Sequence, residues 1–214
     1  MFHPEGPTLR ELAVQALSST ERGYDLLAPK FDHTPFRTPA AILDAVAAFL
    51  APHAPFASGL DLCCGTGAGM AMLRPLCRDR VVGLDVSRVP FGPEFDVVVC
   101  FGATGHFLER DQPRLVAQAA GLLRPGGRLV FVTSWMPPPW SARYWLARGF
   151  NAAMHVRNLL VSPPFVMYYL TFLLPGVRGL LEEQGLAVEA WALADSGPLA
   201  HVWVVSGMRK FRPN

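Results

Sequence analysis

Hydrophobic positions in the first quarter of the chain follow the spacing of amphipathic helices. Residues 8–20 and 38–51 carry apolar side chains three or four positions apart, as at Ile42, Val46 and Leu50. Each segment follows a Thr or a Pro, residue types that commonly start helices. The pattern predicts two helices ahead of the rest of the fold.

Further along, short apolar runs without helical spacing alternate with helical segments. Continuous runs of this length are typical of strands buried on both faces of a parallel sheet. The expected strands are 59–63, 80–84, 95–100, 127–133, 186–193 and 200–206, and the expected helices between them are 67–76, 112–123 and 177–184. This alternation predicts an α/β fold, a three-layer sandwich around a mostly parallel sheet.

Composition favours one cytoplasmic domain. The 214 residues are 51% hydrophobic, so we expect a single domain over 1–214. The net charge of +2, with scattered basic residues, does not favour nucleic acid as a partner. The four cysteines lack CxxC spacing and the N-terminus lacks a signal-peptide pattern. We therefore expect reduced thiols and a cytoplasmic location.

The segment 158–177 contains no charged residue and several aromatic ones. Its length approaches that of a membrane span, but Pro163 and Pro164 would break a spanning helix. A buried helix or a hydrophobic lid is the favoured interpretation, and peripheral contact with a membrane is the next.

A glycine turn follows the expected strand at 59–63. Asp61 is succeeded by Gly65 and Gly67, and such a turn exposes backbone to a ligand near a helix N-terminus. Asp85 ends the next expected strand, where an acid can bind ribose hydroxyls. Together these features favour nucleotide binding; the alternative is that the glycines only close the turn and Asp85 caps the next element. Met70 stands where a nicotinamide-binding motif has its third glycine, which argues against an oxidoreductase.

Several motifs in this order resemble class I methyltransferases that depend on S-adenosylmethionine (SAM), particularly the ubiquinone and menaquinone type. The matching segments are LDLCCGTG at 60–67, GLDVS at 83–87, FDVVVC at 95–100, LLRPGGRLV at 122–130 and YDLL at 24–27. The resemblance implies a Rossmann-like sheet whose last strand is antiparallel, SAM as cofactor and a small-molecule methyl acceptor.

The same resemblance implies a set of cofactor-binding residues around the carboxyl edge of the sheet. It assigns the ribose and the adenine edge to Asp85 and Val86, and the cover over the methionine end to Tyr24. The full set is Tyr24, Asp61, Gly65, Thr66, Gly67, Asp85, Val86, Cys100, Phe101 and Gly102.

The sequence departs from this family between its second and fourth strands. Only residues 87–95 connect them, so the family's third strand, an edge strand, is expected to be absent. Its loss would leave the second strand exposed and weaken the adenine pocket. The alternative function is therefore a truncated, non-catalytic methyltransferase-like domain that binds a partner.

His106, just after the strand at 95–100, is the candidate general base for methyl transfer to a hydroxyl or an acidic carbon. The alternative role is structural, with the side chain capping or bracing the following helix. His33, His53, His155 and His201 lack ligand-like spacing, so no metal is expected.

Acceptor specificity is expected to come from parts of the chain outside the core. We expect N-terminal helices over 1–55, a cofactor-binding core over 56–134, a hydrophobic lid or insertion over 135–185 and final strands over 186–214. Aromatic residues of the insertion could line a pocket for a hydrophobic acceptor, or could simply pack the lid. They are Trp135, Trp140, Trp145, Phe165, Tyr168, Tyr169 and Phe172.

Overall fold

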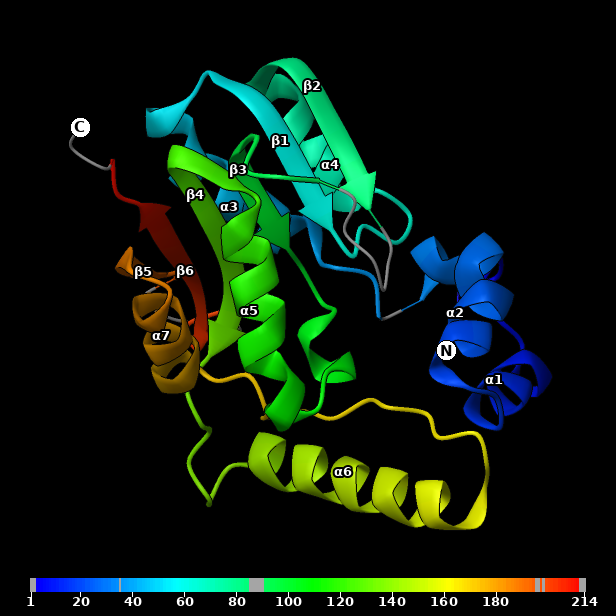
Figure 1. Ribbon diagram of the computed structural model, residues 1–214. Helices are drawn as coiled ribbons and strands as arrows, with labels where there is room; N and C mark the ends of the chain where they lie inside the picture. Colours follow the sequence, from blue (N-terminus) through cyan, green and yellow to red (C-terminus); the bar gives the residue numbers. More distant parts are fainter. Residues whose placement is uncertain (1–2, 35, 85–90, 195–196, 198, 212–214) are drawn as a thin grey trace. The chain divides into compact units, whose positions relative to one another are not determined.

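The computed structural model describes residues 3–34, 36–84, 91–194, 197 and 199–211, and it contains two compact units (Figure 1). The helical unit comprises Met1–Arg37, Gly105–Leu108 and Met136–Thr171. The sheet unit comprises Thr38–Thr104, Glu109–Trp135 and Phe172–Asn214. Each unit is described by itself below, and the single domain expected over 1–214 stays a prediction.

The described part of the sheet unit contains a six-stranded sheet in the order β2-β1-β3-β4-β6-β5. Strands β1 to β4 are parallel, and β6 is antiparallel to both β4 and β5. The strands are β1 Phe56–Leu62, β2 Cys77–Leu84, β3 Phe95–Cys100, β4 Leu123–Ser134, β5 Leu186–Ala192 and β6 Val202–Arg209. The predicted mostly parallel sheet with an antiparallel last strand is confirmed.

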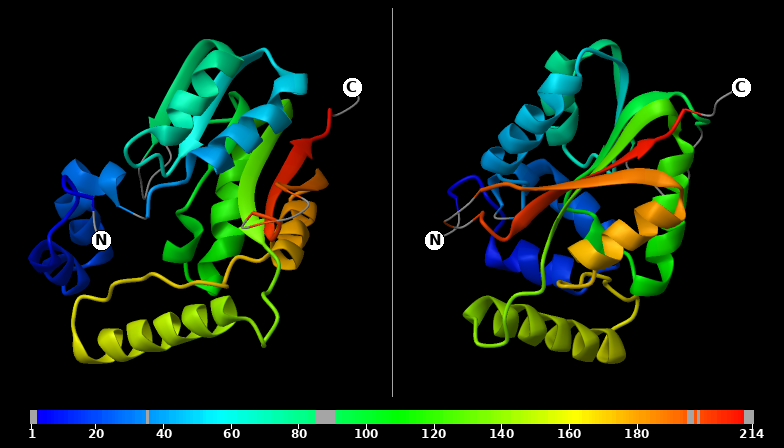
Figure 2. Two further views of the ribbon diagram at one scale, coloured as in Figure 1. Left: turned by 180° about the vertical axis from the view of Figure 1, so that it is seen from behind. Right: turned by 90° about the vertical axis from the view of Figure 1, so that its left-hand side faces the viewer.

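Helices cover both faces of this sheet (Figure 2). Helices α3 and α4 lie on one face, and α5 and α7 lie on the other. Their bounds are α3 Ala40–Leu50, α4 Ala68–Leu73, α5 Gln112–Gly121 and α7 Leu174–Glu183, with short 3-10 segments at Ala51–His53, Arg74–Leu76 and Glu109–Asp111. The predicted three-layer sandwich is therefore confirmed.

A buried aspartate fixes β3 against β1 at the amino end of the sheet. The Asp96 carboxylate accepts hydrogen bonds from the backbone N–H groups of Ala57 and Ser58, each at 2.8 Å, and forms an ion pair with Arg124. Buried carboxylates are tolerated when their oxygens are satisfied in this way. Above it, Val97 and Val99 pack with the helices α3 and α4 in the core. The strand register, and hence the site at the opposite ends of the strands, is set by these contacts.

Strand β2 lies at one edge and pairs only with β1 in the described part of the sheet. Residues 85–90 of the short link lie outside the described residues, and 91–94 contain no strand. The described sheet thus agrees with the expected lack of a further edge strand. The first half of β2 exposes Arg78, Asp79 and Arg80, and charged side chains on an edge strand oppose pairing with another chain.

The helical unit contains α1 Leu9–Ala16, α2 Thr20–Leu27, the 3-10 helix Ala28–His33 and α6 Ala142–Leu160, and another 3-10 turn, Thr104–His106, enters it. The helix predicted over 8–20 forms but ends at Ala16, and Ser19 caps a second helix by accepting from the N–H of Arg22. Arg157 of α6 donates to the carbonyl oxygens of Ala16 at 2.9 Å and Ser18 at 2.8 Å. This arginine therefore ties α6 to the turn between α1 and α2.

The uncharged segment 158–177 is not one helix. It begins in the last turn of α6, continues as irregular chain and ends in α7. Phe165, Tyr168 and Phe172 are buried along the irregular part, whereas Leu159 and Leu160 are exposed. The segment is therefore only partly buried, and it leaves the helical conformation before the two prolines, where the sequence predicted a break. No helix among the described residues combines the length and apolarity needed to cross a bilayer.

Candidate functional site

The turn after β1 has the unusual backbone that the glycine pattern predicts. Cys63, Gly65 and Gly67 adopt positive φ angles of 61°, 48° and 88°. Glycine reaches this region without steric cost, whereas Cys63 is strained there. The N–H groups of Cys63 and Cys64 donate to the carbonyl of Leu84, at 2.6 and 3.3 Å, and so tie the turn to the end of β2. Gly65 and Thr66 remain exposed at its tip.

Asp61, at the end of β1, is the buried support of this turn. Its side chain is only 2% exposed, and Oδ2 accepts a hydrogen bond from the N–H of Met70 at 2.9 Å. Burial raises the pKa of Asp61 to about 6, although hydrogen bonds from the N–H groups of Met70 and Gly69 act in the opposite direction. Asp61 therefore holds the N-terminal turn of α4 against β1, and Gly65 and Thr66 form the open surface.

Gly69 is required by the close approach of α4 to this carboxylate. A Cβ on Gly69 would lie 2.5 Å from Asp61 Oδ2, closer than any real contact. The sequence pattern did not indicate this packing role of Gly69. The Met70 N–H was missed too, because a backbone group has no residue-type signal.

Asp61→Asn is expected to remove a pH dependence of stability. A native pKa raised from 3.8 to about 6 contributes stability that is fully present below pH 3.8 and is lost as the pH rises through 6. The shift corresponds to about 3 kcal/mol. Urea unfolding across this pH range should show that the free energy of unfolding of the wild type falls as the pH rises. The free energy of unfolding of Asp61→Asn should not show this fall. The control is Asp79→Asn, at an exposed acid of β2; equal slopes for Asp61→Asn and wild type would contradict the assignment.

The ends of three neighbouring strands bring most predicted cofactor residues of the sheet unit to one edge. Cys100 pairs in register with Leu62, so β3 ends beside the turn. A hydrogen bond with Cys63, together with burial, raises the pKa of the Cys100 thiol well above its usual value. Phe101 is buried, and Gly102 has a positive φ of 71° where the chain leaves the sheet. Asp85 and Val86 lie outside the described residues, directly after Leu84 at the end of β2.

Tyr24 and His106 meet in the helical unit. The hydroxyl of Tyr24 lies 2.7 Å from His106 Nε2, and His106 Nδ1 lies 2.6 Å from the carbonyl oxygen of Val166. A carbonyl can only accept, so Nδ1 carries the proton and Nε2 of the neutral ring accepts from the Tyr24 hydroxyl. Burial lowers the pKa of His106, partly offset by the bond to Val166. The ring is thus held in the tautomer and charge state of a base.

Aromatic rings surround this pair. The Phe165 ring lies nearly parallel to that of Tyr24 and edge-on to that of His106, and Phe31 packs on the far side of Tyr24. Gly23 permits the approach, since a Cβ there would lie 2.8 Å from Phe165. Of the aromatic residues predicted for an acceptor pocket, Phe165 is the one in contact with both members of the pair. Val166 was missed, because its carbonyl comes from irregular chain 60 residues away.

The other predicted aromatic residues have separate surroundings. Tyr168 stacks on His155, Tyr169 packs against Phe150, Phe172 against Phe131 and Trp135 against Trp203. These contacts fit the alternative in which aromatic side chains pack the insertion. Trp140 and Trp145 are largely exposed.

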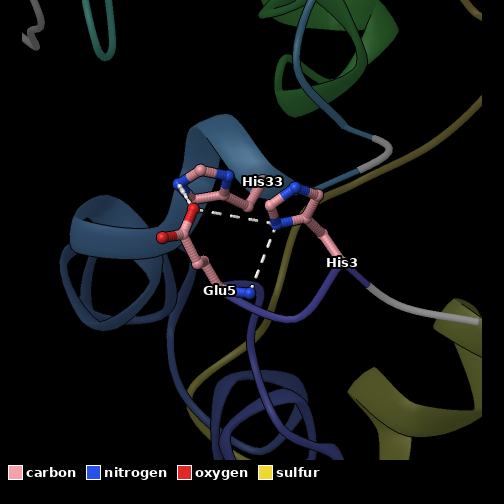
Figure 3. Close-up of side chains that lie close together, drawn as sticks. All are labelled: His3, Glu5 and His33. Atoms are coloured by element: carbon pink, nitrogen blue, oxygen red, sulfur yellow. Dashed lines mark hydrogen bonds and ion pairs between the residues drawn. The ribbon is translucent and has the colours of Figure 1, made fainter.

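A cluster of His3, Glu5 and His33 lies at the N-terminal end of the helical unit (Figure 3). Glu5 Oε2 is 3.5 Å from His33 Nε2 and 4.0 Å from His3 Nδ1. The two rings are stacked, with centroids 4.6 Å apart and planes 17° apart. A metal ion bound by an imidazole nitrogen lies in the plane of that ring. Because the two rings are nearly parallel, one ion cannot lie in both planes unless one ring rotates. The expectation that no metal binds stays a prediction.

Comparisons with known proteins converge on one fold. The family described as "Methyltransferase domain" matches residues 32–165. An O-methyltransferase family protein from Burkholderia thailandensis has a TM-score of 0.64 at 20% identity, over 94% of this chain and 68% of that one. A SAM-dependent methyltransferase from Mesorhizobium loti has a TM-score of 0.55 at 19% identity, over 79% and 98% of the two chains.

Human N-acetylserotonin methyltransferase, solved in complex with SAM, has a TM-score of 0.59 at 14% identity and covers 96% of this chain. This chain spans only 60% of the length of that protein. No curated protein matches the sequence. At these identities the structures show a shared fold.

Proposed function

Because the chain belongs to the methyltransferase-domain family, we propose that it transfers a methyl group from SAM to a hydroxyl oxygen of a small, hydrophobic molecule. SAM-dependent methyl transfer and the SAM cofactor are what the sequence motifs predicted, and the family membership confirms both. The acceptor, its reacting atom and the roles of individual residues are the proposal.

The proposed cofactor site is the edge where β1, β2 and β3 end. The bare backbone of Gly65 and Thr66 can approach a ligand closely, since the turn is exposed and held from behind by Asp61. Asp61 is thus proposed as a positioning residue. The proposed binding residues are Tyr24, Gly65, Thr66, Gly67, Asp85, Val86, Cys100, Phe101 and Gly102. When bound, SAM supplies a methyl group on a sulfonium, which a nucleophile displaces in line.

The hydrogen bonds of His106 are the observation that supports a hydroxyl group as the methyl acceptor. Nε2 accepts the phenolic O–H of Tyr24 at 2.7 Å, and an acceptor hydroxyl that takes the place of the Tyr24 hydroxyl would pass its proton to the same nitrogen. Nδ1–H stays bonded to Val166 and would stabilise the imidazolium that forms. A neutral, oriented imidazole has no use in methyl transfer to a group that is already nucleophilic. His106 is therefore proposed as the general base.

The apolar character of the acceptor is inferred from the surroundings of this base. Phe31 and Phe165 leave the Tyr24–His106 pair among aromatic rings, which favour an apolar or aromatic molecule over a charged one. Of the similar proteins, one is named an O-methyltransferase, which fits a hydroxyl acceptor, and one is named an N-acetylserotonin methyltransferase, which fits a small-molecule acceptor.

Titration of the purified chain with S-adenosylhomocysteine by calorimetry tests the cofactor site. We expect micromolar binding, abolished by Asp85→Ala, because an acid at the end of β2 accepts hydrogen bonds from ribose hydroxyls. The matched control is Asp79→Ala, which removes an exposed acid from β2 and should leave binding unchanged. Turnover is then measured with isotope-labelled SAM and a panel of phenols and quinols. A folded sample that binds no S-adenosylhomocysteine would refute the proposal.

The alternative of a non-catalytic binding module receives less support. It would use the exposed edge of β2, where Arg78, Asp79 and Arg80 oppose strand addition. A cytoplasmic location is proposed from the cysteine usage, since the four cysteines lack CxxC spacing and the density of a secreted disulfide scaffold.

A further inference from the structure

Helix α6 presents a broad apolar face to solvent. None of its residues is buried. Trp145 and Leu146 near its start are 65% and 74% exposed, and Leu159 and Leu160 at its end are 85% and 79% exposed. Single exposed apolar residues are common, but a contiguous set of large ones marks an interaction surface.

These residues form one stripe. At the helical spacing, Trp145, Gly149, Ala152, Val156 and Leu159 or Leu160 succeed one another along the same side, and all are exposed. We call the exposed set of Trp145, Leu146, Val156, Leu159 and Leu160 the α6 face.

The opposite side of α6 is already occupied within the helical unit. Asn151 exchanges hydrogen bonds with the backbone of Tyr169, and Asn158 does so with the backbone of Phe165. The α6 face is therefore the side left without a partner in its own unit.

The charge around this face is positive. Residues 112–181 contain no Asp or Glu. Arg143 and Arg148 of α6 are exposed, and neither forms an ion pair with any residue that the structure describes. Arg157, in contrast, donates inward to backbone carbonyls. An apolar stripe on a helix that carries unpaired arginines and no acidic residue is complementary to a surface that is apolar and anionic.

We propose that the α6 face binds the surface of an anionic lipid bilayer, with the helix lying in the plane of the interface. Apolar side chains on one face of such a helix enter the acyl boundary, tryptophan favours the headgroup level, and arginines attract anionic headgroups. The sequence predicts peripheral membrane contact at 158–177. Leu159 and Leu160 of that segment belong to the α6 face, whereas Phe165, Tyr168 and Phe172 are buried, so the proposed contact surface extends from Leu159 and Leu160 back along α6.

A second copy of the chain is the less favourable occupant. A two-fold dimer through this face would place α6 against itself, with Arg143 and Arg148 of both copies in the interface and no acid on the helix to balance them. The membrane inference does not rest on the proposed acceptor, because vesicle binding is measured without turnover.

Vesicle co-sedimentation of the full chain tests the inference. We expect binding to vesicles of phosphatidylcholine mixed with phosphatidylglycerol, and weaker binding at high salt or to phosphatidylcholine alone. Leu159→Asp combined with Leu160→Asp should lower the partition coefficient at least about tenfold. The matched control is Leu9→Asp, because Leu9 is 75% exposed on α1. Arg143→Gln with Arg148→Gln should reduce the dependence on anionic lipid.

Thermal melts of each variant establish that it is folded. Absence of binding to anionic vesicles by the wild type, or equal binding by the folded Leu159→Asp/Leu160→Asp variant, would overturn the inference. Sedimentation velocity distinguishes the other occupant: a wild-type dimer that binds no vesicles and dissociates in the double variant would assign the face to a second copy.

Discussion

His106→Ala is expected to lower kcat by about 10²- to 10⁴-fold, the usual contribution of a general base. The ring is neutral and oriented, with Nδ1–H fixed by Val166 and Nε2 accepting from Tyr24. Removing it should leave S-adenosylhomocysteine binding within about threefold, because the base acts on the acceptor. The measurement is single-turnover transfer from labelled SAM, with calorimetry of cofactor binding alongside.

The pH profile separates catalysis by His106 from a bracing role. Burial lowers the pKa of His106 below its ordinary value of 6.5, so the base stays neutral to lower pH than a free histidine. In the wild type, kcat/KM should fall only below pH 6.5, and His106→Ala should lose this acid limb. The control is His155→Ala, since His155 stacks on Tyr168 and has no proposed role. If both variants lose similar activity with the same profile, His106 is a structural residue.

The inner strands were predictable because they contain short runs of buried apolar residues. Strand β3 was predicted at the residues it occupies, Phe95–Cys100, all of which are buried. Strand β2 begins at Cys77, three residues before its predicted start. Of the missed residues, Arg78 and Asp79 are exposed and charged at a sheet edge, where a pattern of continuous burial does not apply.

The helical unit was harder to predict because side-chain caps and long-range contacts define it. Residues 8–20 have continuous helical spacing, yet Ser19 starts a new helix there. The irregular chain after α6 is held by Asn158, which both donates to and accepts from the backbone of Phe165. An asparagine in a helical pattern does not reveal which distant backbone it will contact.

The candidate site likewise contains features that the sequence predicts and features that it does not. Asp61 and its glycine turn were recognisable, because positive φ angles and close approaches select glycine. The groups that orient Asp61 and His106 are the N–H of Met70 and the carbonyl of Val166. Every residue has such groups, so only the folded backbone shows which of them are used.

Gly69→Ala is expected to destabilise the sheet unit by about 2–4 kcal/mol and to lower S-adenosylhomocysteine affinity at least about tenfold. The added methyl would lie 2.5–2.7 Å from the Asp61 carboxylate atoms. That carboxylate cannot retreat without leaving its bond to Met70 and remaining buried. The helix would shift, and the exposed tip of the turn would shift with it.

Urea unfolding and calorimetry of four variants test whether the Asp61 carboxylate is the obstacle. Gly179→Ala, in the middle of α7 with no atom within 4 Å of the added carbon, should instead stabilise the chain by about 0.5–1 kcal/mol, as alanine usually does in helices. If the carboxylate is the obstacle, Asp61→Ala combined with Gly69→Ala should cost less than the sum of the single changes. The prediction is contradicted if the changes in the free energy of unfolding are strictly additive, or if Gly69→Ala is as stable as Gly179→Ala. Either result would show that α4 moves without cost and that Asp61 does not set the position of the turn.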